Sequence, residues 1–166
     1  MPVRVLVSRR IHRTLDPPLD QRALRRCVSA AASGLLGRSK RGQVSLLLCS
    51  DRVIRELNRD WLKRDRPTNV IAFPSPVLQA HTQVTGPLAP RPGALDGCVL
   101  AAGPPVHLGD IAVSVDAALR EAGAIARDER VLYLALHGLL HILGWDHVSD
   151  ISWRRMHRAT LQLMPA

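Results

Sequence analysis

The sequence is poor in aromatic residues and in cysteine, and it has no long apolar run. Only 3% of its 166 residues are Phe, Trp or Tyr, so a core must be built from Leu, Val, Ile and Ala. Its cysteines, Cys27, Cys49 and Cys98, form no C-x-x-C pair, which argues against both a disulfide framework and a thiolate zinc site. No apolar segment approaches the roughly 20 residues that span a bilayer, and Arg4 interrupts the N-terminal apolar residues too early for a signal peptide. We therefore expect a cytoplasmic protein without a membrane partner.

The positive charge is concentrated in the first part of the chain. Residues 1–66 hold 16 Lys and Arg against 6 Asp and Glu, a net charge of +10, whereas residues 67–166 hold 7 against 8, a net charge of −1. Clustered cations favour a polyanion such as nucleic acid as the partner, because binding releases condensed counterions. An Arg-rich solvated face that reflects biased genomic composition also explains the asymmetry, so charge alone leaves both interpretations open.

Hydrophobic periodicity predicts alternating short strands and helices in a chain of the usual length for one domain. Strands are expected over residues 3–7, 44–49, 68–73 and 111–115, and helices that begin near residues 20, 51, 116, 128 and 149. In the first helix the apolar stripe is Leu24, Val28, Ala31 and Leu35, and Gly34 and Gly37 are expected to break the helix. Residues 74–107 contain seven of the 12 prolines, which predicts a long surface loop.

The helix that follows Ser50 has two different faces. Its apolar stripe is Val53, Leu57 and Trp61, which are spaced four residues apart. Cations lie on the other face and in the loop after the helix, and we treat them as candidates for RNA binding: Arg52, Arg55, Arg59, Lys63, Arg64 and Arg66. For the helical members of this set, a solvated helix face is an equally good interpretation.

The stretch from His137 to His147 carries the chemistry. His137 and His141 are four residues apart in an apolar helix, so their side chains point the same way from successive turns. Gly144 permits a turn after this helix, through which His147 can reach the same ion. Three neutral imidazoles suit zinc and leave one coordination position open, which is typical of catalytic rather than structural sites. We therefore predict one Zn²⁺ per chain, bound by His137, His141 and His147.

Two neighbours of the histidines bear on the mechanism. Asp146 is a candidate to orient a ligand histidine, and it is equally a candidate cap for the final helix. Gly138 occupies the position at which the zinc-peptidase motif H-E-x-x-H carries its general base, so this helix does not supply that base. A zinc metallopeptidase is therefore only a second alternative, and the catalytic side chains are unknown at this stage.

The segment from His137 to His147 resembles the H-G-x-L-H-L-x-G-x-D-H signature of the YbeY family of rRNA-maturation endoribonucleases. Further segments occur in the family's order. Leu57-Asn58 resembles its L-N pair, residues 67–74 (PTNVIAFP) resemble its P-T-[DN]-V-L-S-F-P segment, and residues 108–111 (LGDI) resemble its L-G-D-I strand. The match covers roughly residues 44–160.

The resemblance implies a fold, a cofactor and an activity. The fold is a single α+β domain over residues 1–166, with a small mixed β-sheet of about four strands, surrounding helices and a central metal-binding helix. The implied ligands of the zinc are His137, His141 and His147. The implied activity is that of a zinc-dependent, single-strand-specific endoribonuclease in 16S rRNA 3′-end maturation and ribosome quality control. Ribosomal RNA and small ribosomal subunit proteins are the implied partners.

The chain departs from the family pattern in two places. Leu62 stands where family members usually carry an Arg that is thought to bind substrate phosphate. Lys63 or Arg64, one or two positions further on, is a candidate to replace that Arg. Each step along a helix turns the side chain by about 100°, so a replacement there points in a different direction. The loop over residues 74–107 is also about 20 residues longer than usual, which costs little at a surface. Leu62 motivates the first alternative function, a non-catalytic rRNA-binding ribosome-assembly factor.

Overall fold

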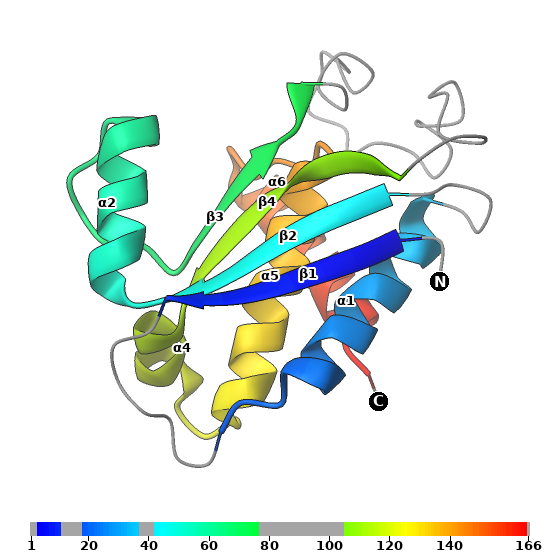
Figure 1. The fold of residues 1–166 in the computed structure, drawn as a ribbon, viewed down its shortest axis with the longest axis horizontal. Coiled ribbons are helices and arrows are strands. Elements are labelled where there is room, and N and C mark those ends of the chain that lie inside the picture. Colours follow the sequence, from blue (N-terminus) through cyan, green and yellow to red (C-terminus); the bar gives the residue numbers. More distant parts are fainter. Residues whose placement is uncertain (1–2, 11–17, 37–41, 77–104, 166) are drawn as a thin grey trace.

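The protein is described here by a computed structural model that covers residues 3–10, 18–36, 42–76 and 105–165 (Figure 1). Four strands form one sheet in the order β1-β2-β4-β3: β1 (Val3–Arg10), β2 (Gly42–Cys49), β3 (Val70–Pro74) and β4 (Val106–Ser114). β1 and β4 run parallel to β2, whereas β3 is antiparallel to β4. The predicted α+β fold with a small mixed sheet is therefore confirmed.

The helices are α1 (Gln21–Leu36), α2 (Asp51–Leu62), α4 (Val115–Ala122), α5 (Arg127–Ile142) and α6 (Asp150–Leu163). Figure 1 shows α1, α5 and α6 behind the sheet, while α2 stands beyond the end at which β2 finishes. Within the described residues, no helix combines the length and the apolar character needed to cross a bilayer.

The main core lies between the sheet and helix α5. Side chains from β2 and β4 meet α1 and α5 in one apolar cluster, and most of α5 is buried on every side, as its sequence predicts. Its fully buried members include Leu134, Leu136, Leu139, Leu140 and Ile142. Such a helix is held from all directions, so it is a rigid base for side chains at its C-terminal end.

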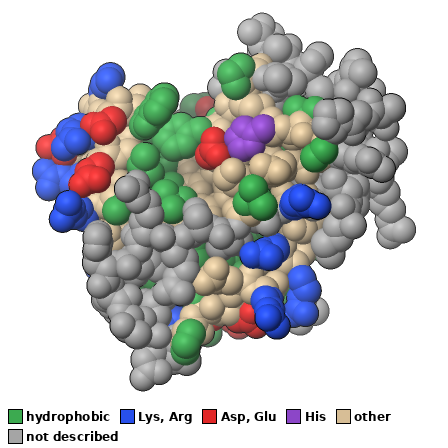
Figure 2. All heavy atoms as spheres, in the orientation of Figure 1, with side chains coloured by type: hydrophobic (Ala, Val, Ile, Leu, Met, Phe, Trp, Pro, Cys, Tyr) green, Lys and Arg blue, Asp and Glu red, His purple; other side chains and the backbone are tan. Residues whose placement is uncertain are grey.

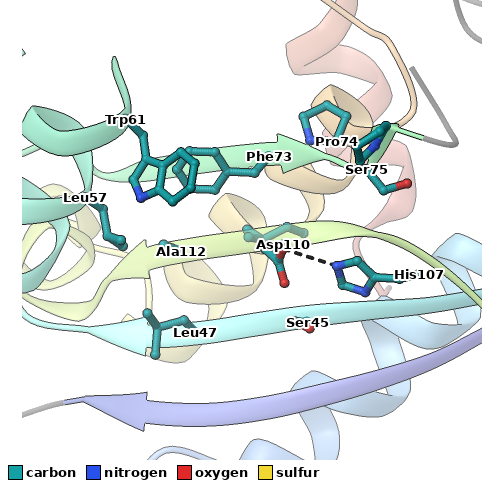
Figure 3. A pocket seen from close by; sticks show the side chains of 12 residues that line it. Ser45, Leu47, Leu57, Trp61, Phe73, Pro74, Ser75, His107, Asp110 and Ala112 are labelled. Carbon is teal, nitrogen blue, oxygen red and sulfur yellow. Dashed lines mark hydrogen bonds and ion pairs between the residues drawn. The ribbon is translucent and has the colours of Figure 1, made fainter. Parts of the chain in front are cut away.

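The opposite face of the sheet is covered only in part by the described residues. A smaller cluster that includes Val53, Ile54 and Ile71 lies beneath α2. Beside it is a hollow of about 470 Å³, in which Trp61 and Phe73 meet edge to face and His107 pairs with Asp110 (Figure 3). This hollow lies on the face away from α5, because Ser45 and Leu47 of β2 alternate with residues buried in the main core.

The apolar stripe predicted for α1 is wrong in its second half. The helix buries Leu24 and Val28 as expected, but then Ala32 and Leu36, whereas Leu35 is exposed. The buried residues follow the i, i+4 row, which runs obliquely to the helix axis and is the row that packs against a neighbouring element. Of the two glycines expected to break this helix, Gly34 does not, because the helix continues to Leu36, and Gly37 lies outside the described residues.

Three other expectations need correction. Strand β4 begins at Val106, five residues before the predicted start at 111, because it pairs on both sides and backbone bonding extends it. Its register against β2 skips Leu108, a β-bulge that hides the alternation in the sequence.

Trp61 is 69% exposed instead of buried, since the last turn of α2 projects past the small cluster. Of the predicted loop over 74–107, Pro74 belongs to β3 and residues 77–104 lie outside the described residues.

Candidate metal centre

Helix α5 ends in a turn that folds the chain back beside its last residues. The N–H of Gly144 donates to the carbonyl of His141 and that of Trp145 to the carbonyl of Leu140, each at 3.0 Å. This pair of bonds is the Schellman pattern, which places its glycine in the left-handed region, and Gly144 has a φ of 88°. The turn returns His147 to the helix end that carries the other two histidines.

The imidazoles of His137, His141 and His147 converge. Their ring centroids are 4.9 to 5.2 Å apart, and one ligand nitrogen from each ring lies within 4.8 Å of the others. The Nε2 atoms of His141 and His147 are 3.2 Å apart, close to the roughly 3.3 Å expected between two ligands of a tetrahedral zinc with 2.0–2.1 Å bonds. The donor set therefore fits zinc.

Hydrogen bonds fix which nitrogen of each helical histidine is free. His141 Nδ1 lies 2.9 Å from the Trp145 carbonyl, which can only accept, so the proton is on Nδ1. His137 Nδ1 lies 3.4 Å from the Thr160 hydroxyl, and that hydroxyl gives its own proton to the Met156 carbonyl at 2.8 Å. Thr160 is thus left to accept from His137. In both rings Nε2 keeps its lone pair for a metal.

Burial keeps these rings neutral. Burial first, and then the neighbouring His141 and His147, lower the pKa of His137 to about 4. Burial, followed by His147, also lowers the pKa of His141, against a smaller opposing effect of the Trp145 carbonyl. Neutral imidazole is the form that binds metal, so at neutral pH neither His137 nor His141 has to lose a proton before an ion binds.

The cluster opens into a cavity of about 400 Å³. The segment just before β3 contributes Thr68 and Asn69, while α5 and α6 contribute the side chains that face the histidines: Arg130, Tyr133, Trp153 and His157. Among the described residues the cluster holds three ligands, all histidines. An ion bound there keeps a side that faces the cavity, which is where a substrate oxygen can approach.

Asp146 does not have the role of a histidine-orienting group in this structure. Its Oδ1 accepts from the backbone N–H of His147 at 2.7 Å, so the carboxylate shapes the turn between α5 and α6. The cap of α6 is instead Ser149, whose hydroxyl accepts from Ser152 N–H in a capping box. The groups that orient the ligand rings are Thr160 and the Trp145 carbonyl, and neither is marked by a local motif.

The cations predicted for RNA binding fall into two groups. Those on α2 pair with carboxylates: Arg52 with Glu56, Arg55 with Asp65 and Arg59 with Asp60, at 3.2, 2.8 and 2.9 Å. Figure 2 shows the cations over α2 standing among acidic side chains. Lys63 donates to the carbonyl of Asp60 at 2.8 Å. This arrangement favours the solvated-face interpretation for the α2 cations.

Arg64 and Arg66 lie elsewhere. They line a polar hollow of about 350 Å³ together with Arg120, and this hollow shares Thr68 and Asn69 with the histidine cavity. No carboxylate within the described ranges pairs with Arg64 or Arg66. Leu62 lines neither cavity and is 45% exposed. Of the predicted cations, these two are the ones next to the histidines.

Sequence reasoning missed Arg130, Tyr133 and His157. Arg130 and Tyr133 precede His137 by seven and four residues on α5, so helical spacing alone places all three on one face. Tyr133 stacks on His137 with ring centroids 6.0 Å apart, and the Arg130 guanidinium lies 4.9 Å from the centre of the Tyr133 ring. Helical spacing over the two preceding turns of α5 therefore predicts Arg130 and Tyr133, whereas His157 lies on α6 and no spacing along α5 indicates it.

Two motif glycines lie where elements pack closely: Gly138 of α5 against β4, and Gly109 of β4 against β3. A Cβ on Gly138 would lie 2.7 Å from Ile111 Cγ2, so this position faces β4 rather than the histidine cavity. A Cβ on Gly109 would lie 2.5 Å from the Phe73 carbonyl oxygen, and its φ of 153° also excludes other residues. A peptidase base at position 138 has neither the space nor the direction to reach the cavity.

A mixed sheet backed by a buried helix, with three histidines at the helix end and an open cavity before them, defines a small α+β protein with a candidate catalytic metal centre. Residues 12–166 match the Endoribonuclease YbeY family. Endoribonuclease YbeY of Thermus thermophilus is 35% identical over 164 residues, which is 98% of each chain. The Ruegeria pomeroyi protein of that name is 37% identical over 139 residues, covering 82% of this chain and 77% of its own.

A solution structure of a Thermotoga maritima protein superposes with a TM-score of 0.51 at 18% identity, covering 97% of this chain and 88% of that one. This likeness supports the fold alone. The family match and the identities carry the assignment, and the chain belongs to the YbeY endoribonuclease family, as its motifs predict.

Proposed function

We propose that this protein is a zinc-dependent endoribonuclease that cleaves single-stranded RNA. The observation that carries the proposal is the convergence of His137, His141 and His147 in a 400 Å³ cavity, with the tautomers of His137 and His141 fixed by hydrogen bonds. Structural zinc sites are closed by four protein ligands, whereas a three-histidine set leaves a position for substrate. Membership of a family whose relatives are named endoribonucleases supports RNA as the substrate.

The chain's own residues bind and orient the RNA. When bound, zinc supplies Lewis-acid chemistry, by withdrawing charge from a phosphoryl oxygen and by making an attacking water more acidic. Arg64 and Arg66 lie beyond Thr68 and Asn69, where they would hold backbone phosphates that flank the cleaved one. Arg130 stands in the histidine cavity itself, and Glu121 and the Tyr133 ring fix its guanidinium there.

We further propose, from the family resemblance, that the natural substrate is the 3′ end of 16S rRNA. On this proposal the protein acts in the cytoplasm, meets small ribosomal subunit proteins on the same particle and contributes to ribosome quality control. The basic residues 1–66, with a net charge of +10, would strengthen attraction to a particle coated with phosphate.

The experiment compares His141→Ala with His107→Ala. His141→Ala removes a central ligand and is expected to abolish both zinc retention, measured by mass spectrometry of metals, and cleavage of a defined single-stranded RNA. His107 lies in the hollow on the other face of the sheet, so His107→Ala is the matched control and should retain both properties. Cleavage that persists in metal-free His141→Ala protein would refute the mechanism.

The alternative function is a ribosome-assembly factor that binds rRNA without cutting it. Leu62 supports this alternative, because it is an exposed apolar residue at the position where the family resemblance leads us to expect an Arg. The test is cleavage by purified wild-type and Leu62→Arg proteins, with and without chelator. Activity that only Leu62→Arg possesses would establish the assembly factor, and chelator-sensitive wild-type activity would exclude it.

A further inference from the structure

One wall of the histidine cavity is built from aromatic rings that no zinc ligation requires. Trp153 and His157, on successive turns of α6, stack with ring centroids 5.0 Å apart and planes inclined by only 9°. Both line the cavity that holds the three ligand histidines. The Trp153 residue remains 48% exposed although one face of its ring is covered by His157.

We propose that Trp153, supported by His157, is a stacking platform for one unpaired base of the RNA substrate. This proposal rests on the proposed function and adds a base-binding subsite to it. An indole is a large flat surface, and every nucleobase has a complementary π-face, so stacking binds bases with little regard to their identity. Bases within a duplex are already stacked on their neighbours, so such a platform selects single strands.

The platform is fixed before substrate arrives. His157 Nδ1 is 2.6 Å from the Tyr133 hydroxyl, and Tyr133 in turn stacks on the ligand ring of His137. A continuous series of rings therefore joins the base platform to the metal ligands. Because its partners already hold the indole, ordering it costs little when a base binds.

The surroundings favour a nucleotide over a neutral aromatic ligand. Arg130 lies in the same cavity, and Arg64 and Arg66 lie in the adjoining hollow past Thr68 and Asn69. A base on Trp153 and phosphates directed at these cations would place the intervening backbone against the histidine cluster. The combination of a flat ring, cations and a metal site in adjoining cavities matches the chemistry of a single nucleic-acid strand.

The test is equilibrium binding of a fluorescent, unstructured short RNA to the full-length protein in chelator, which stops cleavage. Trp153→Ala is expected to weaken binding by roughly 5- to 150-fold, the range found for removal of one stacking aromatic, whereas Trp153→Phe keeps a ring and should retain most of the affinity. Trp61→Ala is the matched control, because Trp61 is also an exposed tryptophan, more so than Trp153, but lies in the hollow on the other face.

The decisive measurement moves an abasic site along the RNA. In the wild-type chain, one position should lose affinity by a similar factor, and at that position Trp153→Ala should cause no additional loss. Equal affinity of wild type and Trp153→Ala, or losses that simply multiply at every position, would overturn the platform. If the platform fails while His141→Ala still abolishes zinc retention and cleavage, the proposed function stands. Failure of the wild type to bind RNA would overturn both.

Discussion

Thr160 offers a direct test of how the metal site is prepared. Its side chain is completely buried, and its hydroxyl accepts from His137 Nδ1 while donating to the Met156 carbonyl. Thr160→Val keeps the shape of the side chain and removes the hydroxyl, which is the acceptor for His137 and the donor to the Met156 carbonyl. The Nδ1 proton then loses its partner, so the tautomer that leaves Nε2 free is no longer favoured.

The expected magnitude follows from the geometry. Removing a partner that orients a ligand histidine typically weakens metal binding 10- to 100-fold, and the 3.4 Å distance here points to the lower end. We expect Thr160→Val to bind zinc about 10-fold more weakly, which is about 1.4 kcal/mol. Folding should change little, because the backbone bond to the Met156 carbonyl within α6 remains.

Zinc affinity can be measured by competition with a fluorescent chelator, with urea unfolding of the metal-free protein as the control for stability. Thr160→Ser keeps a hydroxyl and should recover most of the lost affinity. If Thr160→Val binds zinc as tightly as the wild type while folding normally, then Thr160 does not set the tautomer of His137 and the reasoning is wrong.

Three further outcomes are expected. Gly138→Ala should lower the free energy of unfolding by about 1–3 kcal/mol, because the new Cβ meets Ile111. Gly34→Ala, with open space around it in a helix, should instead raise that free energy by about 0.5–1 kcal/mol. Urea titration of both variants decides whether close packing at Gly138 is the cause. In metal-free protein, the free energy of unfolding should fall by at most about 3 kcal/mol on account of His137 as the pH drops from 6.5 to about 4. The reason is that His137 takes up its proton at a higher pH in the unfolded chain than in the folded one. A flat profile of unfolding free energy against pH would contradict the lowered pKa. Arg66→Ala should weaken RNA binding at low salt and reduce the slope of log affinity against log salt by about 0.7, and an unchanged slope would place Arg66 outside the RNA track.

Much of the fold could be predicted because strong periodicity is a local property. The apolar helix pattern of α5 and the short continuous apolar run of β2 each determine an element without reference to the rest of the chain. The second half of the α1 stripe could not be predicted, since Ala31 and Ala32 have the same side chain and only contact with the rest of the fold decides which is buried. Likewise, Trp61 is apolar and correctly spaced, yet nothing in its helix reveals that α2 extends past its cluster.

In the candidate metal centre, too, some residues could be predicted from local spacing and others could not. The three histidines could be identified because they lie within one turn and its flanking helix, where spacing alone determines direction. Thr160 and His157 come from α6, and their relation to His137 depends on how two helices pack. Asp146 illustrates the opposite error: it is adjacent to His147 in sequence, but its carboxylate is used by the backbone. Nearness along the chain predicted a partnership that the fold gives to a residue on another helix.

The Schellman turn after α5 has a consequence for how the protein acquires its ion. All three donor rings come from residues 137–147, so closing the chelate requires almost no additional chain ordering once α5 is in place. The sheet and the main core do not depend on that closure, since apolar packing holds them together and buries α5, the helix that carries His137 and His141. Ion exchange can therefore take place on a finished scaffold, and the zinc occupancy of a preparation reports its exposure to metals and chelators rather than its state of folding.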